Sequence, residues 1–145
     1  MALLEWHFDC SFRNDREVYL VGKQLESRRL SLQDIRRRLD TPLIGQHLYL
    51  LDEVESTNVS LRAIARAGGA EGTVVVAESQ THGRGRHGQP WFSPPGVNLY
   101  ASALFRPSFL PRDAASFSFV ASLAVYDALR ELGGEPGIKW PNDVI

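Results

Sequence analysis

The stretch GTVVVAE, residues 72–78, is rich in β-branched residues and carries only one charge. A segment of this composition favours a strand buried in the middle of a sheet. The mostly apolar run at 47–54 and the run NLYASALFR at 98–106 predict two further strands, one before it and one after it. We therefore expect a sheet whose central strand is the 72–78 segment.

Three helices are predicted around these strands. Ser31 and either Ser56 or Thr57 stand at helix starts, because a hydroxyl there can accept a hydrogen bond from the first helical turn. The second of these helices closes at Gly68-Gly69. Its packing residues are predicted to be Val59, Leu61, Ile64, Ala65 and Ala67.

The third helix is the strongest, since apolar residues recur at helical spacing from Phe117 to Leu132, with Val120 among them. After it, Ile138-Lys139-Trp140 predicts the start of another strand, which Pro141 interrupts. Strands and helices thus alternate along the chain. The fold class is predicted to be α+β or α/β, a mixed β-sheet with packing helices.

The bulk composition limits the function classes. With 145 residues, 43% hydrophobic and 23% charged, the chain is expected to be about one soluble globular domain. Its single cysteine, Cys10, can form no internal disulfide, and no Cys/His cluster has the spacing of a zinc site. Neither a basic leader nor an apolar run of the roughly 18 residues that span a bilayer is visible, so no membrane association and a cytoplasmic location are expected.

Two regions of the chain differ in character. Residues 1–29 mix aromatic and charged residues without a period, and only Glu17 to Val21 predicts a short strand there. Residues 30–145 carry the strands and helices and form the predicted domain. Because apolar residues follow directly on a polar turn at Asp143-Val144-Ile145, we expect the polypeptide to stop within a domain.

A long loop, residues 80–96, follows the central strand and contains Gly83-Arg84-Gly85-Arg86-His87-Gly88. No Asp or Glu occurs from Ser79 to Arg112, so the net charge of −1 hides a locally basic stretch. Glycines let backbone N–H groups converge on an anion, and arginines add charge-assisted contacts. The loop therefore predicts anion binding. A solvated basic loop and a nucleic-acid-binding Arg-Gly tract are the alternatives, and the pattern matches neither a Walker loop nor a dinucleotide fingerprint.

The sequence resembles the biotin protein ligase family at four places, in order. These are Glu55-Ser56-Thr57-Asn58, then Gln80 with the Gly83 to Gly88 segment, then Trp91-Phe92-Ser93-Pro94 with Gly96-Val97-Asn98-Leu99-Tyr100, and finally Lys139-Trp140-Pro141-Asn142-Asp143. The resemblance covers residues 30–145. It implies the N-terminal part of a class II synthetase-like biotin/lipoate ligase catalytic domain, with residues 1–29 as a remnant of a winged-helix domain.

The resemblance also implies an activity and a set of ligands. Biotin attacks the α-phosphate of MgATP to give biotinyl-5'-AMP, and a lysine of a biotin carboxyl carrier domain, such as that of acetyl-CoA carboxylase, then takes the biotinyl group. Biotin, ATP and Mg²⁺ are the ligands this implies, with Asn142 and Asp143 near the nucleotide or its Mg²⁺; no residue is assigned as a metal ligand. Such a site must bring together two anions, which repel each other unless cations and backbone dipoles lie between them.

The resemblance assigns roles residue by residue. It implies biotin contacts from Ser56, Thr57, Asn58, Gln80, Gly83, Arg84, Gly85 and Arg86. It implies nucleotide contacts from Arg84, Arg86, Trp91, Lys139, Asn142 and Asp143, with Arg86 and Lys139 as the catalytic residues. Structural roles are the alternatives: helix capping for Ser56 and Thr57, a core anchor for Trp91, and a surface turn for Pro141-Asn142-Asp143.

The chain also departs from the family. A further lysine, the rest of the sheet and a small C-terminal β domain would follow Ile145 in the family. Glu17 to Val21 resembles the end of a wing, but no helix-turn-helix precedes it, so DNA binding is not supported. A homodimer is left open. The competing interpretations are a lipoate ligase or octanoyl transferase, and a truncated, non-catalytic biotin-binding fragment.

Overall fold

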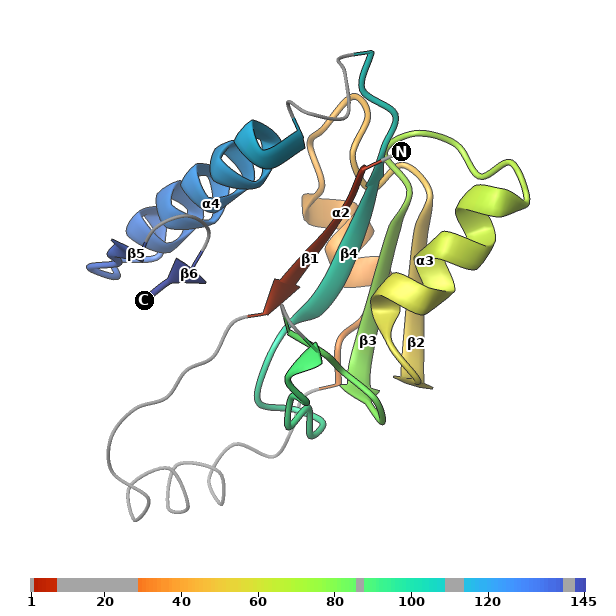
Figure 1. Ribbon diagram of the computed structural model, residues 1–145, viewed down its shortest axis with the longest axis horizontal. Helices are drawn as coiled ribbons and strands as arrows, with labels where there is room; N and C mark the ends of the chain where they lie inside the picture. The colour runs from red at the N-terminus through yellow and green to blue at the C-terminus, as the bar shows by residue number, and fades with distance from the viewer. Residues whose placement is uncertain (1, 8–28, 86–87, 109–113, 140–142) are drawn as a thin grey trace.

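The computed structural model describes residues 2–7, 29–85, 88–108, 114–139 and 143–145 (Figure 1). The strand predicted at 17–21 and two of the predicted site residues, Arg86 and Asn142, lie outside this part of the chain. None of the helices in the described ranges is long and apolar enough to cross a membrane.

Four strands form the main sheet: β1 (Ala2–His7), β2 (Leu48–Val54), β3 (Val74–Gln80) and β4 (Tyr100–Phe105), in the order β1-β4-β3-β2. β2 and β3 are parallel, whereas β4 is antiparallel to both β3 and β1. The sheet is therefore mixed and β3 lies inside it, as predicted. β1 was not predicted, and it brings residues 2–7 into the same sheet as the rest of the domain.

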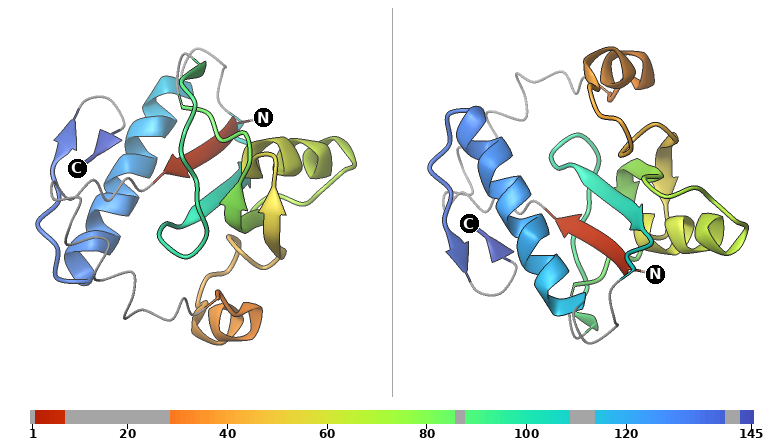
Figure 2. Two further views of the ribbon diagram at one scale, coloured as in Figure 1. Left: turned by 90° about the horizontal axis from the view of Figure 1, so that it is seen from below. Right: turned by 90° about the horizontal axis from the view of Figure 1, so that it is seen from above.

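Helices lie on both faces of this sheet (Figures 1 and 2). Helix α3 (Thr57–Arg66) buries Leu61 and Ala65 against Val75 and Leu104 of β3 and β4. Helix α2 (Leu32–Arg38) contacts β2. Helix α4 (Ala114–Glu131) contacts β1 and sets Phe117 edge-on against Phe105 at 4.9 Å between ring centroids. Because Phe105 alternates with Leu104 along β4, α4 reaches the face opposite α3.

Helix boundaries follow their capping residues. Ser31 Oγ accepts a hydrogen bond from Asp34 N, and Ser56 Oγ accepts one from Asn58 N, so both predicted N-caps are confirmed. Gly68 ends α3 with φ +88°, a backbone conformation that favours glycine.

The predicted packing faces are only partly right. Val59 on α3 and Ala67, the C-cap residue that follows it, are exposed, while Leu61, Ile64 and Ala65 pack as predicted. On α4, Val120 is 57% exposed and Leu132, just past the helix, is 85% exposed. The apolar residues of α4 occupy more of its circumference than the sheet covers, so periodicity alone identifies the helix but not its buried face.

A separate two-stranded ribbon ends the chain. β5 (Ile138–Lys139) pairs antiparallel with β6 (Asp143–Val144), and β6 contacts α4 (Figure 1). The strand predicted at 138–140 is thus present at Ile138 and Lys139. Its partner is the end of the chain and not the main sheet.

Candidate functional site

The site begins where β2 and β3 end. Parallel strands place their carboxyl ends at one edge of a sheet, and the register pairs Val54 with Gln80. The chain leaves β2 through Glu55 into Ser56, which caps α3 with φ −160° and a 3.2 Å bond to Asn58 N. This geometry brings the start of α3 beside the end of β3.

Three buried polar side chains meet at this corner, which we call the Thr57 corner: Thr57, Gln80 and Ser102. Thr57 donates to Gln80 Oε1 twice, from its backbone N at 2.8 Å and from Oγ1 at 3.1 Å. Thr57 Oγ1 also lies 2.8 Å from Ser102 Oγ. The exposed fractions of the three residues are 1%, 6% and 0% respectively, so hydrogen bonds between them take the place of water.

The segment from Gly83 to Trp91, which we call the glycine loop, folds against this corner. Trp91 N donates to Gly83 O, Gly85 N donates to Gln89 O, both at 2.8 Å, and Arg84 forms an isolated bridge with Pro90. The loop therefore turns back on itself as a short hairpin.

The glycines at 83 and 85 also make room for side chains. A Cβ on Gly83 would lie 2.9 Å from Gln80 Nε2 and 2.8 Å from Ser93 Oγ. A Cβ on Gly85 would overlap the indole of Trp91, with Cε2 at 2.8 Å. Trp91 is half-buried, whereas Arg84 is exposed. The sequence indicated glycines that free backbone N–H groups for an anion, and the structure adds that they let Gln80 and Trp91 approach the backbone.

Tyr100 holds the end of the 80–96 loop through hydrogen bonds of its hydroxyl. Its ring is fully buried, and its hydroxyl donates to Pro94 O at 2.9 Å and accepts from Asn98 Nδ2 at 3.2 Å. Burial raises the pKa of Tyr100 above 10.0, and hydrogen bonds with Asn98 and Ser93 oppose that rise. Tyr100 thus ties residues 93–98 to β4.

The sequence alone predicted no individual role for Ser93 or for Ser102. Both are buried, and Ser102 stands between Tyr100 and Leu104 on one face of β4. A small hydroxyl among large buried residues at every second position is a signal that could have marked it.

Lys139 and Asp143 lie elsewhere. They pair across the β5–β6 ribbon with Nζ and Oδ2 4.0 Å apart, and their side chains are 71% and 57% exposed. The ribbon stands beside α4, away from the end of β3 (Figure 1). Of the predicted site residues that the structure describes, it brings together Ser56, Thr57, Asn58, Gln80, Gly83, Gly85 and Trp91, with Arg84 exposed on the same loop, but not Lys139 and Asp143.

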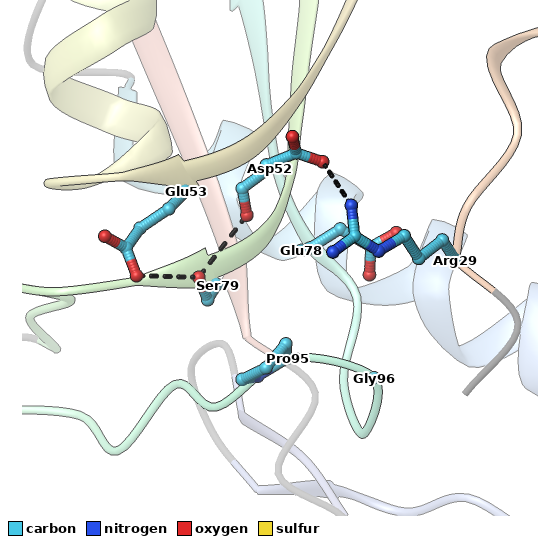
Figure 3. A pocket seen from close by; sticks show the side chains of 7 residues that line it. All are labelled: Arg29, Asp52, Glu53, Glu78, Ser79, Pro95 and Gly96. Atoms are coloured by element: carbon cyan, nitrogen blue, oxygen red, sulfur yellow. Dashed lines mark hydrogen bonds and ion pairs between the residues drawn. The ribbon is translucent and has the colours of Figure 1, made fainter. Parts of the chain in front are cut away.

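A separate pocket of about 300 Å³ lies beside the ends of β2 and β3, lined by Arg29, Asp52, Glu53, Glu78, Ser79, Pro95 and Gly96 (Figure 3). Arg29 pairs with Asp52 at 3.3 Å, and Ser79 Oγ donates to Glu53 Oε2 at 3.4 Å. Three carboxylates against one arginine make it unsuitable for an anion. No group of three or more His, Cys, Asp or Glu side chains in the described ranges could hold a metal ion.

The sequence and the fold of this chain match one family of known proteins. The sequence fits the profile of the biotin/lipoate A/B protein ligase family over residues 51–145. The chain belongs to this family.

Individual relatives agree with this assignment. The chain is 36% identical over 118 residues to the bifunctional ligase/repressor BirA of Bacillus subtilis, an alignment that covers 81% of this chain and 36% of that protein. It is 38% identical over 120 residues to the biotin-(acetyl-CoA-carboxylase) ligase of Mycobacterium tuberculosis, covering 75% of this chain and 45% of that one.

A solved structure extends the likeness to the fold. The biotin protein ligase from Aquifex aeolicus, in complex with biotin and ATP, superposes with a TM-score of 0.59 at 37% identity and covers 68% of this chain and 41% of that chain. The predicted resemblance and the fold class are thereby confirmed. The chain spans between 36% and 45% of the length of these three relatives.

Proposed function

We propose that this chain carries the biotin-binding part of a biotin protein ligase. The enzyme would join biotin to ATP as biotinyl-5'-AMP, releasing pyrophosphate, and then pass the biotinyl group to a lysine amine of a carboxyl carrier domain with loss of AMP. The observation that carries the proposal is the Thr57 corner, where buried neutral hydrogen-bonding groups meet the glycine loop.

The chemistry of the corner suits the uncharged end of biotin. A ureido ring is polar, flat and neutral, so it needs hydrogen-bonding groups without charge, in a place where water does not compete. Ser56, Thr57, Asn58 and Gln80 offer such groups at the start of α3 and the end of β3. We propose that these four residues bind the ring.

The loop suits the charged end of the ligand. Gly83 and Gly85 let Gln80 and Trp91 lie close to the backbone on either side of Arg84, which is exposed and carries positive charge. We propose that these residues, with Arg86, line the biotin carboxylate and the phosphates, because a carboxylate and a triphosphate can approach only where positive charge lies between them. Trp91, packed against Gly85, would then cover the nucleotide.

The triphosphate needs further groups. We propose Lys139 for the phosphates, with Asn142 and Asp143 near the nucleotide. Mg²⁺, which neutralises charge on the phosphates, is usually held by phosphates together with one or two carboxylates. The exposed carboxylate of Asp143 fits that requirement.

Residues 30–145 would be the N-terminal part of the catalytic domain, acting in the cytoplasm. The acceptor would be the biotin carboxyl carrier domain of acetyl-CoA carboxylase or a related carboxylase. The relative from Mycobacterium tuberculosis, by its name, acts on acetyl-CoA carboxylase, which supports this choice.

Biotin-dependent exchange of labelled pyrophosphate into ATP tests the proposed activation step. Exchange by the 145-residue chain that requires biotin, and that falls in Arg86→Ala and Lys139→Ala, would support the proposal. Exchange driven equally by lipoate would shift the function to the lipoate branch of the family. A chain that binds biotin without catalysing exchange would be a non-catalytic biotin-binding fragment, and the claim of ligase activity would then be withdrawn.

A further inference from the structure

We propose that Ser102 is a positioning residue for the biotin site. Its hydroxyl acts through Thr57 to hold the carboxamide of Gln80 in one orientation, with Nε2 toward the glycine loop. The reference to biotin rests on the proposed function. The orientation of Gln80 rests only on hydrogen bonds within the chain.

Two donors from Thr57 orient the carboxamide, and its backbone N–H shows which atom of the amide faces them. Thr57 N lies 2.8 Å from the Gln80 side chain, and a backbone N–H can only donate. The atom facing it must therefore be Oε1, because a flipped amide would set two donors against each other. Nε2 then lies on the other side, where a Cβ on Gly83 would come within 2.9 Å of it.

The direction of the remaining hydrogen bonds follows from the first. Gln80 Oε1 has no hydrogen, so Thr57 Oγ1, at 3.1 Å, must donate its only proton to it. Ser102 Oγ, 2.8 Å from Thr57 Oγ1, must then be the donor of that pair. The three groups form a relay with one polarity: Ser102 donates to Thr57, and Thr57 donates to Gln80.

Burial makes this relay hard to replace. Ser102 and Thr57 are 0% and 1% exposed, so water does not supply a substitute donor. Ser102 reaches Thr57 because the register pairs it with Val75, on the face of the sheet that α3 covers. Alanine would fill the same place between Tyr100 and Leu104 if packing were the only requirement.

The relay has a consequence for the ligand. Thr57 donates twice to Oε1, so the carboxamide presents its Nε2 hydrogens on the side of Gly83 and Ser93. Gln80 therefore acts as a hydrogen-bond donor toward the loop. Oxygen acceptors of the ureido and carboxylate kinds match that polarity.

The first test needs no ligand. We would record the Gln80 side-chain amide signals of the ¹⁵N-labelled 145-residue chain, assign them by their loss in Gln80→Glu, and measure the nuclear Overhauser effect to the Gly83 α protons. Ser102→Ala should shift these signals and weaken the effect. The control is Ser122→Ala, which removes an equally buried hydroxyl that bonds Ser118 O at 3.0 Å within α4. Unchanged Gln80 signals in Ser102→Ala would overturn the proposal.

The second test uses biotin. Ser102→Ala should weaken biotin binding by about three- to tenfold, the size expected for loss of one buried hydrogen bond. If Ser102 acts through Gln80, the same change in a Gln80→Ala background should have almost no effect. Equal weakening in both backgrounds would mean general destabilisation and would also overturn the proposal.

The two tests separate this inference from the proposed function. A wild-type chain that does not bind biotin would contradict the proposed function, while the Gln80 signals would still decide whether Ser102 positions the carboxamide.

Discussion

The Thr57 corner and the β5–β6 ribbon hold the two chemical halves of the proposed site in different ways. In the corner, Thr57, Gln80 and Ser102 are at most 6% exposed, and Thr57 is hydrogen-bonded to the other two at 2.8–3.1 Å. In the ribbon, the side chains of Lys139 and Asp143 are 71% and 57% exposed, and Nζ and Oδ2 are as far as 4.0 Å apart. Neutral polar groups can be buried once they are hydrogen-bonded, whereas buried charges cost much more unless they are fully paired. The neutral groups of the corner are therefore held in place by hydrogen bonds without a ligand, whereas the charged groups of the ribbon stay exposed to solvent.

Gly85→Ala should have the largest effect on the corner. The new Cβ would overlap the Trp91 indole, so the hairpin must shift, and overpacking of this kind costs about 1–3 kcal/mol. We expect biotin affinity to fall by roughly tenfold or more, because about 1.4 kcal/mol corresponds to a factor of ten. Urea unfolding and biotin titration measure the two effects.

The matched control is Gly137→Ala in the approach to the ribbon. Its Cβ would meet Ile145 Cγ1 at 3.4 Å, an ordinary contact. A Gly85→Ala chain that unfolds and binds like this control would refute the close packing of Trp91 on Gly85.

Thr57→Val should come next. Valine keeps the shape of threonine but removes the hydroxyl, which leaves Ser102 without its acceptor and Gln80 Oε1 with one donor instead of two. A buried polar group left unsatisfied costs about 1–3 kcal/mol of unfolding free energy. The exposed Thr81 gives the control, since Thr81→Val should change stability by less than about 0.5 kcal/mol. Similar values for both variants would show that the relay adds no stability.

Tyr100→Phe should have a smaller effect that depends on pH. Removing the hydroxyl takes away the bonds to Pro94 O and Asn98, at a cost of about 1 kcal/mol near neutral pH. Because burial raises the pKa of Tyr100, the folded chain favours the neutral phenol. The stabilisation of the folded chain by the neutral phenol is present below the ordinary pKa of 10.0. It is lost as the pH rises through the higher pKa that Tyr100 has in the folded chain.

The difference in unfolding free energy between wild type and Tyr100→Phe should therefore shrink above about pH 10, as measured by urea unfolding across that range. A difference that stays constant or grows would contradict the burial of the hydroxyl.

Lys139→Ala should have the smallest effect on stability. An exposed pair 4.0 Å apart contributes little, so the unfolding free energy should change by less than about 0.5 kcal/mol. Asp143→Ala should change the unfolding free energy by a similarly small amount. A loss of unfolding free energy above about 1 kcal/mol would show that this ion pair stabilises the ribbon. The ribbon would then not differ from the corner in how its polar groups contribute to stability.

Local signals made much of the fold predictable. The β-branched run 74–76 marks the central strand, and the hydroxyls of Ser31 and Ser56 mark helix starts, because each acts on neighbours within a few residues. β1 was missed because Ala2–His7 has no clear period, and its place depends on pairing with β4, about a hundred residues away in the sequence.

The sequence proposed a set of candidate residues for the site but not the contacts between them. The motif residues from Ser56 to Trp91 meet because the parallel register pairs Val54 with Gln80, and a one-residue slip would turn these side chains to the other face. Ser102 could not be assigned, since its role depends on the pairing of β4 with β3 and on the helix packed above them. Long-range register, not composition, determines these contacts.

The most direct measurement is calorimetric titration of biotin into three forms of the 145-residue chain: wild type, Gln80→Ala and Lys139→Ala. We expect one biotin site in the wild type, a strong but still measurable weakening in Gln80→Ala, and nearly unchanged affinity in Lys139→Ala. Binding that is equally strong in Gln80→Ala, or that depends on Lys139 instead, would contradict the placement of biotin at the Thr57 corner.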